Sequence, residues 1–174
     1  KGKIIALNGD TLYGELNFQG DLANSKEIRF RNQDLDSIYR PFEIGSYSFE
    51  NGKCYTSKIA ITNKDTVRIF AEYLVDGKKD IFFHRSTSGF HYSISVSDTV
   101  IKEISATIET VNIDGVNYQK ESKQYIGYLK AYFNDCPPLF SKIDQLKSPE
   151  RKSLTSLTKE YNDITCGEGK CIIY

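Results

Sequence analysis

Residues 125–138 of this chain have the sequence YIGYLKAYFNDCPP. The large apolar side chains of this stretch recur every three or four residues, the spacing that places side chains on one face of an α-helix. Two prolines then end the helix, because proline lacks the backbone N–H that a further turn would need. An aromatic face of this size needs a partner surface, so the stretch predicts a seam between a helix and a sheet. The face consists of Tyr125, Tyr128, Leu129, Tyr132, Phe133 and Cys136.

Upstream of this helix, apolar residues alternate with a period of two, which predicts short β-strands. Three hairpins are predicted at dipeptides that supply the positive φ values of tight turns. The third of them, with strands over residues 66–75 and 78–85, is apolar on both faces. We therefore expect it in the middle of the sheet, where the helices pack. The turn dipeptides are Asn8-Gly9, Asn51-Gly52 and Asp76-Gly77, and further strands are expected over residues 90–96, 100–104 and 108–116.

Downstream of residue 137 the period stays helical and predicts two more short helices, over residues 138–147 and from residue 148 onward. Ser148 is the expected N-cap of the last helix, with Pro149 at its first position. The pattern as a whole predicts an α+β fold. We expect an antiparallel sheet or partly open barrel of about seven to nine strands over residues 3–118, followed by a three-helix cap over residues 122–165.

Length predicts a single domain over residues 1–174. We divide it into a β-rich part (1–118), a helical cap (119–166) and a tail (167–174). The end of the tail, from Cys171 to Tyr174, resembles a strand cut short, so we expect the natural polypeptide to continue.

Charge and composition exclude several classes of protein. Lys and Arg together number 23, as do Asp and Glu, so no net field attracts nucleic acid or anionic lipid. No apolar run approaches the roughly 18 to 20 residues that span a bilayer, so we expect no transmembrane segment. The chain begins with Lys1 and contains no Met, which favours a processed protein from which a secretory signal has been removed.

The four cysteines favour an oxidising compartment, because their number is even and two of them follow predicted helices. A bridge between Cys136 and Cys166 would join the ends of the first and third helices. Closing a loop of about 30 residues in this way is worth roughly 3 kcal/mol. Cys54 and Cys171 would then connect the sheet to the tail. A local Cys166–Cys171 bridge and free buried thiols are the alternatives.

The two histidines, His84 and His91, are weak candidates for a metal site. If residues 86–89 form a four-residue hairpin loop, the two imidazoles face each other across neighbouring strands. Such a pair can share a metal or respond to pH. No third ligand is evident in the loop, so an ordinary half-exposed cross-strand pair is the favoured interpretation. We expect neither a metal nor another cofactor.

No motif of a known catalytic class is present, since G-x-S-x-G, H-E-x-x-H, P-loop and dinucleotide-binding sequences are all missing. Ser88-Gly89 beside His91 is interpreted as part of a polar loop rather than as an activated nucleophile. We therefore expect no catalytic residue and no enzymatic activity. A hydrolase would gain support from a Ser or Cys that converges with a His in a cleft.

Tyrosines on the wet face of the sheet are the better candidates for binding. Tyr13, Tyr47, Tyr55 and Tyr92 belong to a set too large to be wholly buried if the strands alternate as predicted. Several tyrosines on one exposed face would suit a protein contact or the stacking of a sugar.

Four segments resemble, in order and spacing, a family of uncharacterised envelope proteins of Bacteroidota. In that family a signal peptide precedes the domain, and an outer-membrane β-barrel often follows it. The resemblance implies a place outside the cytoplasm, in the periplasm or at the cell surface, associated with the outer membrane. It also supports the Cys136–Cys166 bridge, whereas Cys54 and Cys171 depart from the family pattern. The segments are GKIIALNGDTLYGEL (residues 2–16), FAEYLVDGKKDIFF (70–83), YIGYLKAYFNDCPP (125–138) and LTKEYNDITC (157–166).

The function expected from these observations is that of a non-catalytic, extracytoplasmic protein-interaction module. Its partners would be other envelope proteins, including an outer-membrane β-barrel, and not nucleic acid. The alternative is a domain that binds glycans or peptides at the cell surface. The first predicts a contiguous exposed apolar patch, and the second predicts a groove lined by Tyr.

Overall fold

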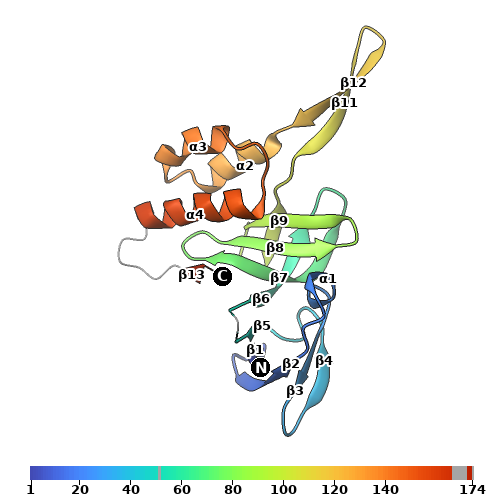
Figure 1. The fold of residues 1–174 in the computed structure, drawn as a ribbon, viewed down its shortest axis with the longest axis vertical. Coiled ribbons are helices and arrows are strands. Elements are labelled where there is room, and N and C mark those ends of the chain that lie inside the picture. Colours follow the sequence, from blue (N-terminus) through green and yellow to red (C-terminus); the bar gives the residue numbers. More distant parts are fainter. Residues whose placement is uncertain (51, 166–171, 174) are drawn as a thin grey trace.

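The computed structural model describes residues 1–50, 52–165 and 172–173 of the chain. Its strands form a closed five-stranded barrel that is extended by further strands and covered on one side by a small helical cap (Figure 1). The β-rich body followed by helices confirms the α+β prediction. The barrel consists of β6 (Cys54–Ile61), β7 (Thr66–Asp76), β8 (Ile81–Ser86), β9 (Gly89–Ser95) and β10 (Val100–Glu103).

The barrel is closed, which corrects the expectation of a purely antiparallel and partly open sheet. Successive strands from β6 to β10 pair antiparallel or close the ring, and β10 pairs with β6 in parallel. An odd number of strands in an up-and-down order leaves the first and the last running in the same direction. Closure of a five-stranded meander therefore requires one parallel pair. The barrel interior contains Ala60, Ile69, Ala71, Phe82 and Ile101.

The predicted third hairpin is confirmed as the centre of the structure. β8 is covered on both faces, because Phe82 points into the barrel whereas Ile81 and Phe83 belong to the core beneath the cap. Its partner β7 contributes Leu74 to the same core. This double coverage explains why the sequence of the hairpin is apolar at consecutive positions.

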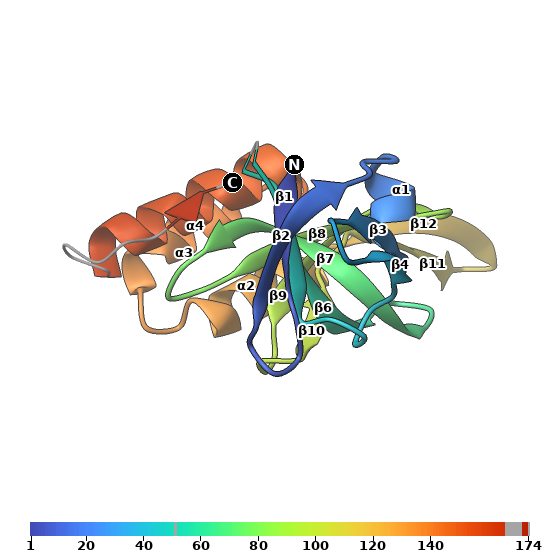
Figure 2. The same ribbon diagram turned by 90° about the horizontal axis from the view of Figure 1, so that it is seen from below.

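The N-terminal strands extend the barrel sheet through β5 and curl into a second apolar cluster (Figure 2). Tyr47 and Tyr55 stack across β5 and β6 with ring centroids 4.7 Å apart. The Tyr47 hydroxyl donates to the carbonyl of Asn24 in a one-turn helix, which fixes the curl. These elements are β1 (Gly2–Ile5), β2 (Thr11–Leu16), α1 (Asp21–Asn24), β3 (Ile28–Arg31), β4 (Asp36–Tyr39) and β5 (Ser46–Phe49).

The helical cap packs on the outer face of β7 and β8, as the aromatic stretch predicts. Tyr125, Leu129 and Phe133 are fully buried there, whereas Tyr128 lies at the exposed flank under the ammonium of Lys102. The buried face is therefore narrower than the six-residue pattern. The cap consists of α2 (Gln124–Tyr132), the 3₁₀ turn η1 (Pro137–Leu139), α3 (Phe140–Asp144) and α4 (Arg151–Thr165).

A buried charge cluster ties α4 to the barrel. The Glu72 carboxylate on β7 is 2% exposed and accepts hydrogen bonds from the Arg151 guanidinium, at 3.1 Å, and from the Tyr55 hydroxyl. Since Arg151 is the first residue of α4, this helix begins two residues later than the predicted Pro149 start. The predicted Ser148 cap is also wrong, because its hydroxyl donates to the side chain of Glu150.

Strand number and sheet membership also depart from the prediction. The described residues form thirteen strands, more than the expected seven to nine, and the short β13 (Ile172–Ile173) pairs with the end of β7. β11 (Thr107–Ile113) and β12 (Val116–Ser122) form a separate two-stranded sheet instead of joining the main one. We call this hairpin, residues 107–122, the arm. It projects away from the barrel and the cap (Figure 1).

Candidate functional site

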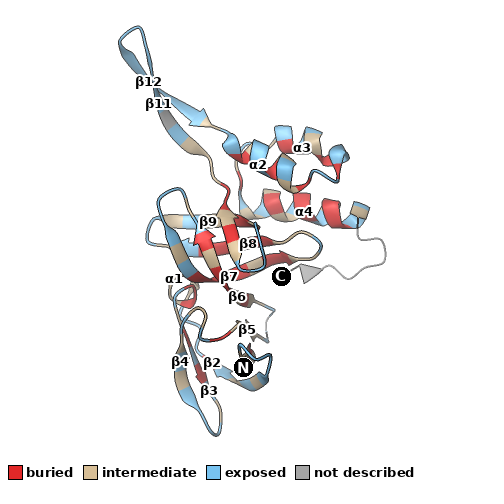
Figure 3. Ribbon diagram, turned by 180° about the vertical axis from the view of Figure 1, so that it is seen from behind, coloured by how far each residue is buried: buried red, intermediate tan, exposed pale blue. Residues whose placement is uncertain are grey.

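The arm is a hairpin that no other described part of the chain covers along most of its length. Its turn is made by Asp114 and Gly115, both at positive φ, and Asn112 and Asn117 exchange a side-chain hydrogen bond beside the turn. Figure 3 shows mostly exposed residues along the arm, whereas buried residues gather in the barrel and the cap. An isolated two-stranded hairpin is only marginally stable in water. The exposed apolar residues of the arm therefore need an explanation.

Four apolar residues of the distal half of the arm share one face, whereas Ile108 at its base is exposed on the opposite face. Residues that oppose each other in an antiparallel pair project from the same face, and the register pairs Val111 with Tyr118 and Ile113 with Val116. Their side chains are 37%, 52%, 54% and 52% exposed for Val111, Tyr118, Ile113 and Val116. The opposite face of the distal half carries Thr110, Asn112, Asn117 and Gln119. We call the first set the distal apolar face.

A polar hollow of about 580 Å³ lies at the end of the barrel where three connections meet. The β6–β7 turn contributes Asn63 and Lys64, the β8–β9 turn contributes Ser86 and Ser88, and the end of β10 contributes Glu103. Strand pairing decides this placement, because the parallel pair β10–β6 brings the end of β10 beside the β6–β7 turn. The residues come from separate parts of the sequence, so their convergence is a product of barrel closure.

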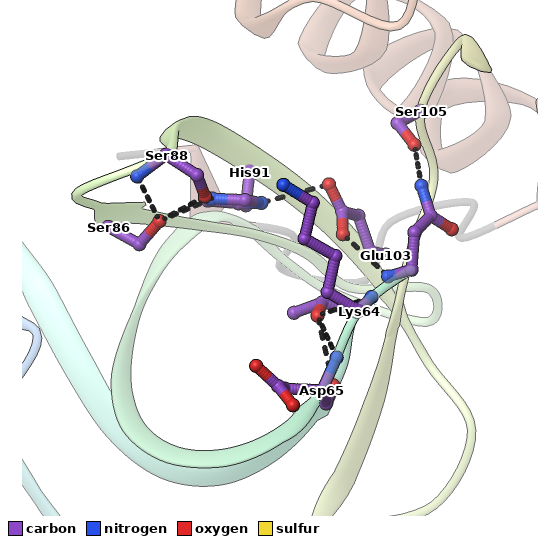
Figure 4. A network of polar contacts seen from close by, with 9 residues as sticks. Lys64, Asp65, Ser86, Ser88, His91, Glu103 and Ser105 are labelled. Atoms are coloured by element: carbon purple, nitrogen blue, oxygen red, sulfur yellow. Dashed lines mark hydrogen bonds and ion pairs between the residues drawn. The ribbon is translucent and has the colours of Figure 1, made fainter. Parts of the chain in front are cut away.

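Ser86, His91 and Glu103 form a continuous chain of hydrogen bonds in this hollow (Figure 4). The Nδ1 of His91 lies 2.9 Å from Glu103 Oε1, and its Nε2 lies 2.7 Å from Ser86 Oγ. An ionised carboxylate can only accept, so the neutral imidazole carries its proton on Nδ1. Nε2 is then free to accept the Ser86 hydroxyl proton. A second contact joins Nε2 to Ser88 Oγ at 3.1 Å.

The remaining carboxylate oxygen of Glu103 accepts the backbone N–H of Asn63 at 3.2 Å. Both members of the His91–Glu103 pair are largely buried, with side chains 12% and 9% exposed. Low exposure strengthens their hydrogen bond and keeps competing water away. The carboxylate is therefore held at both oxygens, and its orientation fixes that of the imidazole.

His84 forms the floor beside this chain. His84 opposes His91 in the β8–β9 register, as predicted, and the two rings stack with centroids 4.6 Å apart. The connecting turn has two residues instead of four, and the pair is largely buried instead of half-exposed. Burial, with a smaller contribution from neighbouring His91, lowers the pKa of His84 to about 4. His84 is thus neutral at pH 7, and its Nδ1 is buried without a hydrogen-bond partner.

A metal site at the histidine pair would need further ligands. No group of three His, Cys, Asp or Glu side chains within residues 1–50, 52–165 and 172–173 has a geometry that could hold a metal ion. What the pair and its neighbours can do is proton transfer: a carboxylate holds an imidazole whose other nitrogen faces a hydroxyl.

The four tyrosines predicted to form a binding surface do not converge. Tyr47 and Tyr55 are 1% and 2% exposed and belong to the N-terminal core cluster, which corrects their assignment to a wet face. Tyr13 is 72% exposed on β2, whereas Tyr92 packs beside Phe83 at the edge of the cap core. The curl of the N-terminal strands buries both faces at Tyr47, so alternation alone misleads there.

The predicted disulfides involve residues outside the described part of the chain. Cys136 is buried under the cap, and Cys54 lies at the start of β6. Both proposed partners, Cys166 and Cys171, lie in the range 166–171 that the structure leaves undescribed. The Cys136–Cys166 and Cys54–Cys171 pairings stay predictions.

Sequence reasoning missed Ser86 and Glu103. Ser86 was part of the predicted hairpin loop, and its spacing from His91 was a usable signal once that loop was assigned. Glu103 had no such signal, because it lies on another strand and reaches His91 only through the closed barrel.

No family model matches the chain, and no curated protein or solved structure shows significant similarity to it. The resemblance to envelope proteins of Bacteroidota therefore stays an expectation. Across the described residues, no helix has the length and hydropathy needed to cross a bilayer.

Proposed function

We propose that this protein is an interaction module of the cell envelope that docks onto another protein through the arm. The observation that carries the proposal is the distal apolar face, four adjacent apolar side chains on a hairpin whose other face is polar over residues 110–119. Hairpin geometry displays these side chains together, whereas scattered surface apolar residues would have no such arrangement.

The partner that fits this face is a protein with an apolar groove. The four side chains expose on the order of 300 Å², an area typical of functional patches on monomers. Two arms pressed together would bury about 600 Å² in total, less than the roughly 1,000 Å² expected of a specific interface. A groove that also encloses the edges and the polar face of the hairpin would reach that area.

Charge argues against an anionic lipid surface as the partner. Residues 110–119 contain no Lys or Arg, and Asp114 at the tip carries a negative charge. Binding to anionic membranes relies on basic residues beside the apolar ones. An extracytoplasmic partner associated with the outer membrane, as the family resemblance implies, is part of the same proposal.

Crosslinking from the two faces of the arm tests this function. A photoreactive amino acid at position 118 reports on the distal apolar face, and the same amino acid at position 119 reports on the polar face one residue away. In living cells, we expect a discrete protein adduct from position 118 that is much stronger than any adduct from position 119. Equal adducts from both positions, or a crosslinked second copy of this chain, would overturn the proposal.

Binding by the purified proteins then measures the contribution of the face. Tyr118→Ser should weaken the affinity for the crosslinked partner at least about 10-fold, because buried aromatic anchors dominate interface energies. Gln119→Ser on the opposite face is the matched control and should stay within about 3-fold. Unchanged affinity of Tyr118→Ser would rule out the distal apolar face as the docking element.

A further inference from the structure

We infer that the polar hollow is a catalytic site in which Ser86 is a nucleophile, His91 its general base and Glu103 the group that positions the base. This activity goes beyond docking and contradicts the expectation that the chain has no catalytic residue. Three side chains from β8, β9 and β10 meet in an order that matches the proton path of serine acyl transfer.

The geometry selects Ser86 over Ser88 as the nucleophile. Ser86 Oγ lies 2.7 Å from His91 Nε2, compared with 3.1 Å for Ser88 Oγ. Ser86 Oγ also accepts the backbone N–H of Ser88 at 3.0 Å, and the Ser88 hydroxyl lies 2.7 Å from it. A hydroxyl that already accepts hydrogen bonds gives up its proton more readily, because the alkoxide that remains is stabilised.

Two neighbours complete the site. The neutral ring of His84 stacks on His91, so no second positive charge opposes the imidazolium that forms during proton transfer. Lys64 also lines the hollow. A cation at this position can offset the negative charge that develops on a substrate oxygen.

The reaction is ester hydrolysis through an acyl-enzyme. Ser86 Oγ bonds to the acyl carbon while His91 Nε2 takes the hydroxyl proton. The bond from the acyl carbon to the alcohol oxygen breaks, and His91 returns the proton to that oxygen. Water then attacks the acyl carbon and gives a proton to His91. When the bond to Oγ breaks, this proton passes to Ser86, so ester and water become acid and alcohol without any change of oxidation state.

The lining of the hollow indicates the substrate class. Most of its side chains are hydroxyls, amides and charged groups, with Val67, Phe90 and Ala106 as apolar exceptions. Its volume of about 580 Å³ suits a small molecule. The geometry fits a short-chain acyl ester of a polar alcohol, with the acyl group near the apolar residues.

Labelling with diisopropyl fluorophosphate tests the nucleophile in the whole chain. This probe forms a covalent bond with an activated serine and releases fluoride. We expect one adduct per molecule, located by fragmentation at Ser86 in the tryptic peptide of residues 86–102. Hydrolysis of 4-nitrophenyl acetate by the same protein gives the turnover rate.

Substitutions separate catalysis from folding. Ser86→Ala and His91→Asn should each slow labelling and hydrolysis at least about 100-fold. Ser88→Ala removes one hydroxyl contact of Ser86 but keeps the Ser86–His91 hydrogen bond, so it should slow both rates by about 10-fold, much less than Ser86→Ala. Glu103→Gln, which keeps the shape of the side chain, should lower the maximal labelling rate but leave the half-saturating probe concentration unchanged. All variants should keep the circular dichroism spectrum of the parent.

The outcome is decisive in both directions. A labelling rate no faster than that of the urea-unfolded chain, an adduct on another residue, or labelling that survives His91→Asn in a folded variant would overturn the inference. Tyr118→Ser should label at the parental rate, so a failure of the docking proposal leaves this result unaffected.

Discussion

The hairpin β8–β9 and the arm have similar local designs but opposite environments. Both are antiparallel ribbons of about the same length, each closed by a two-residue turn. A glycine at positive φ follows the turn in one, at Gly89, and belongs to the turn in the other, at Gly115. The β8–β9 hairpin is covered by the barrel interior on one face and by the cap on the other. The arm is covered on neither face over residues 110–121.

This comparison teaches that hairpin formation and hairpin burial have different causes. Turn chemistry and alternation form the ribbon, and both are local properties of the sequence. Burial depends on which other elements reach the ribbon. The apolar face of β8–β9 is covered within this chain except at Phe90, whereas the distal apolar face of the arm stays exposed. Each of the following three experiments challenges that contrast.

The largest expected difference comes from aromatic truncation. Phe83→Ala on β8 should lower the free energy of unfolding by about 3–5 kcal/mol, because the ring is enclosed between the barrel and the cap. Tyr118→Ala on the arm should change it by no more than about 0.5 kcal/mol. Urea denaturation monitored by far-ultraviolet circular dichroism measures both. A comparable loss from the two substitutions would remove the contrast.

Acid should destabilise the folded protein at the β8–β9 hairpin through protonation of His84. Its pKa is lowered from 6.5 to about 4 in the folded protein, so the unfolded chain binds more protons between these values. The contribution of His84 to the free energy of unfolding is complete above pH 6.5. It is lost as the pH falls toward 4, by roughly 3 kcal/mol in total. The other titratable groups that line the same hollow are His91, Glu103, Lys64 and Asp65.

Urea denaturation at pH 7 and pH 4.5 measures this linkage. His84→Gln should make the free energy of unfolding depend less on pH in this window, because the substitution removes the group that binds the proton. A chain with the arm substitution Tyr118→Ser should keep the parental profile. A parental pH dependence in His84→Gln would show that another group is responsible.

The smallest difference is expected at the turn glycines. A Cβ added at Gly89 or Gly115 would meet no atom within 4 Å, so alanine there acts only through the positive φ of 135° or 79°. Gly89→Ala should reduce global stability by about 1 kcal/mol. Gly115→Ala should fray the arm locally without a measurable global effect, since the arm opens independently of the core.

Native-state hydrogen exchange resolves the two cases. Arm amides should exchange much faster than those of β8 in the parent, and Gly115→Ala should accelerate only the arm. Equal slowing or acceleration in both hairpins would mean that the arm is part of the cooperative unit.

The sequence predicted elements better than their assembly. The two-sided apolar hairpin and the buried side of α2 follow from local pattern, and the structure confirms them. The tight turns are wrong in detail. Ile5 pairs with Thr11 and only Gly9 of the first dipeptide has a positive φ, whereas Val75 pairs with Ile81 across a longer connection in which neither Asp76 nor Gly77 has one. Only part of the polar hollow was predictable from the sequence. Opposition of His84 and His91 followed from where the turn was centred, although the turn has two residues and not four, whereas Glu103 required knowledge of which strand closes the barrel.

What the sequence by itself determined is therefore the set of ribbons and helices, because turn geometry and side-chain period act over a few residues. Tertiary structure alone decided that five strands close with one parallel pair, that Tyr47 is covered on both sides, and that Glu103 reaches His91. It also left the arm outside the sheet. The physical reason is that long-range pairing depends on the summed burial of many segments, a quantity that no local pattern contains.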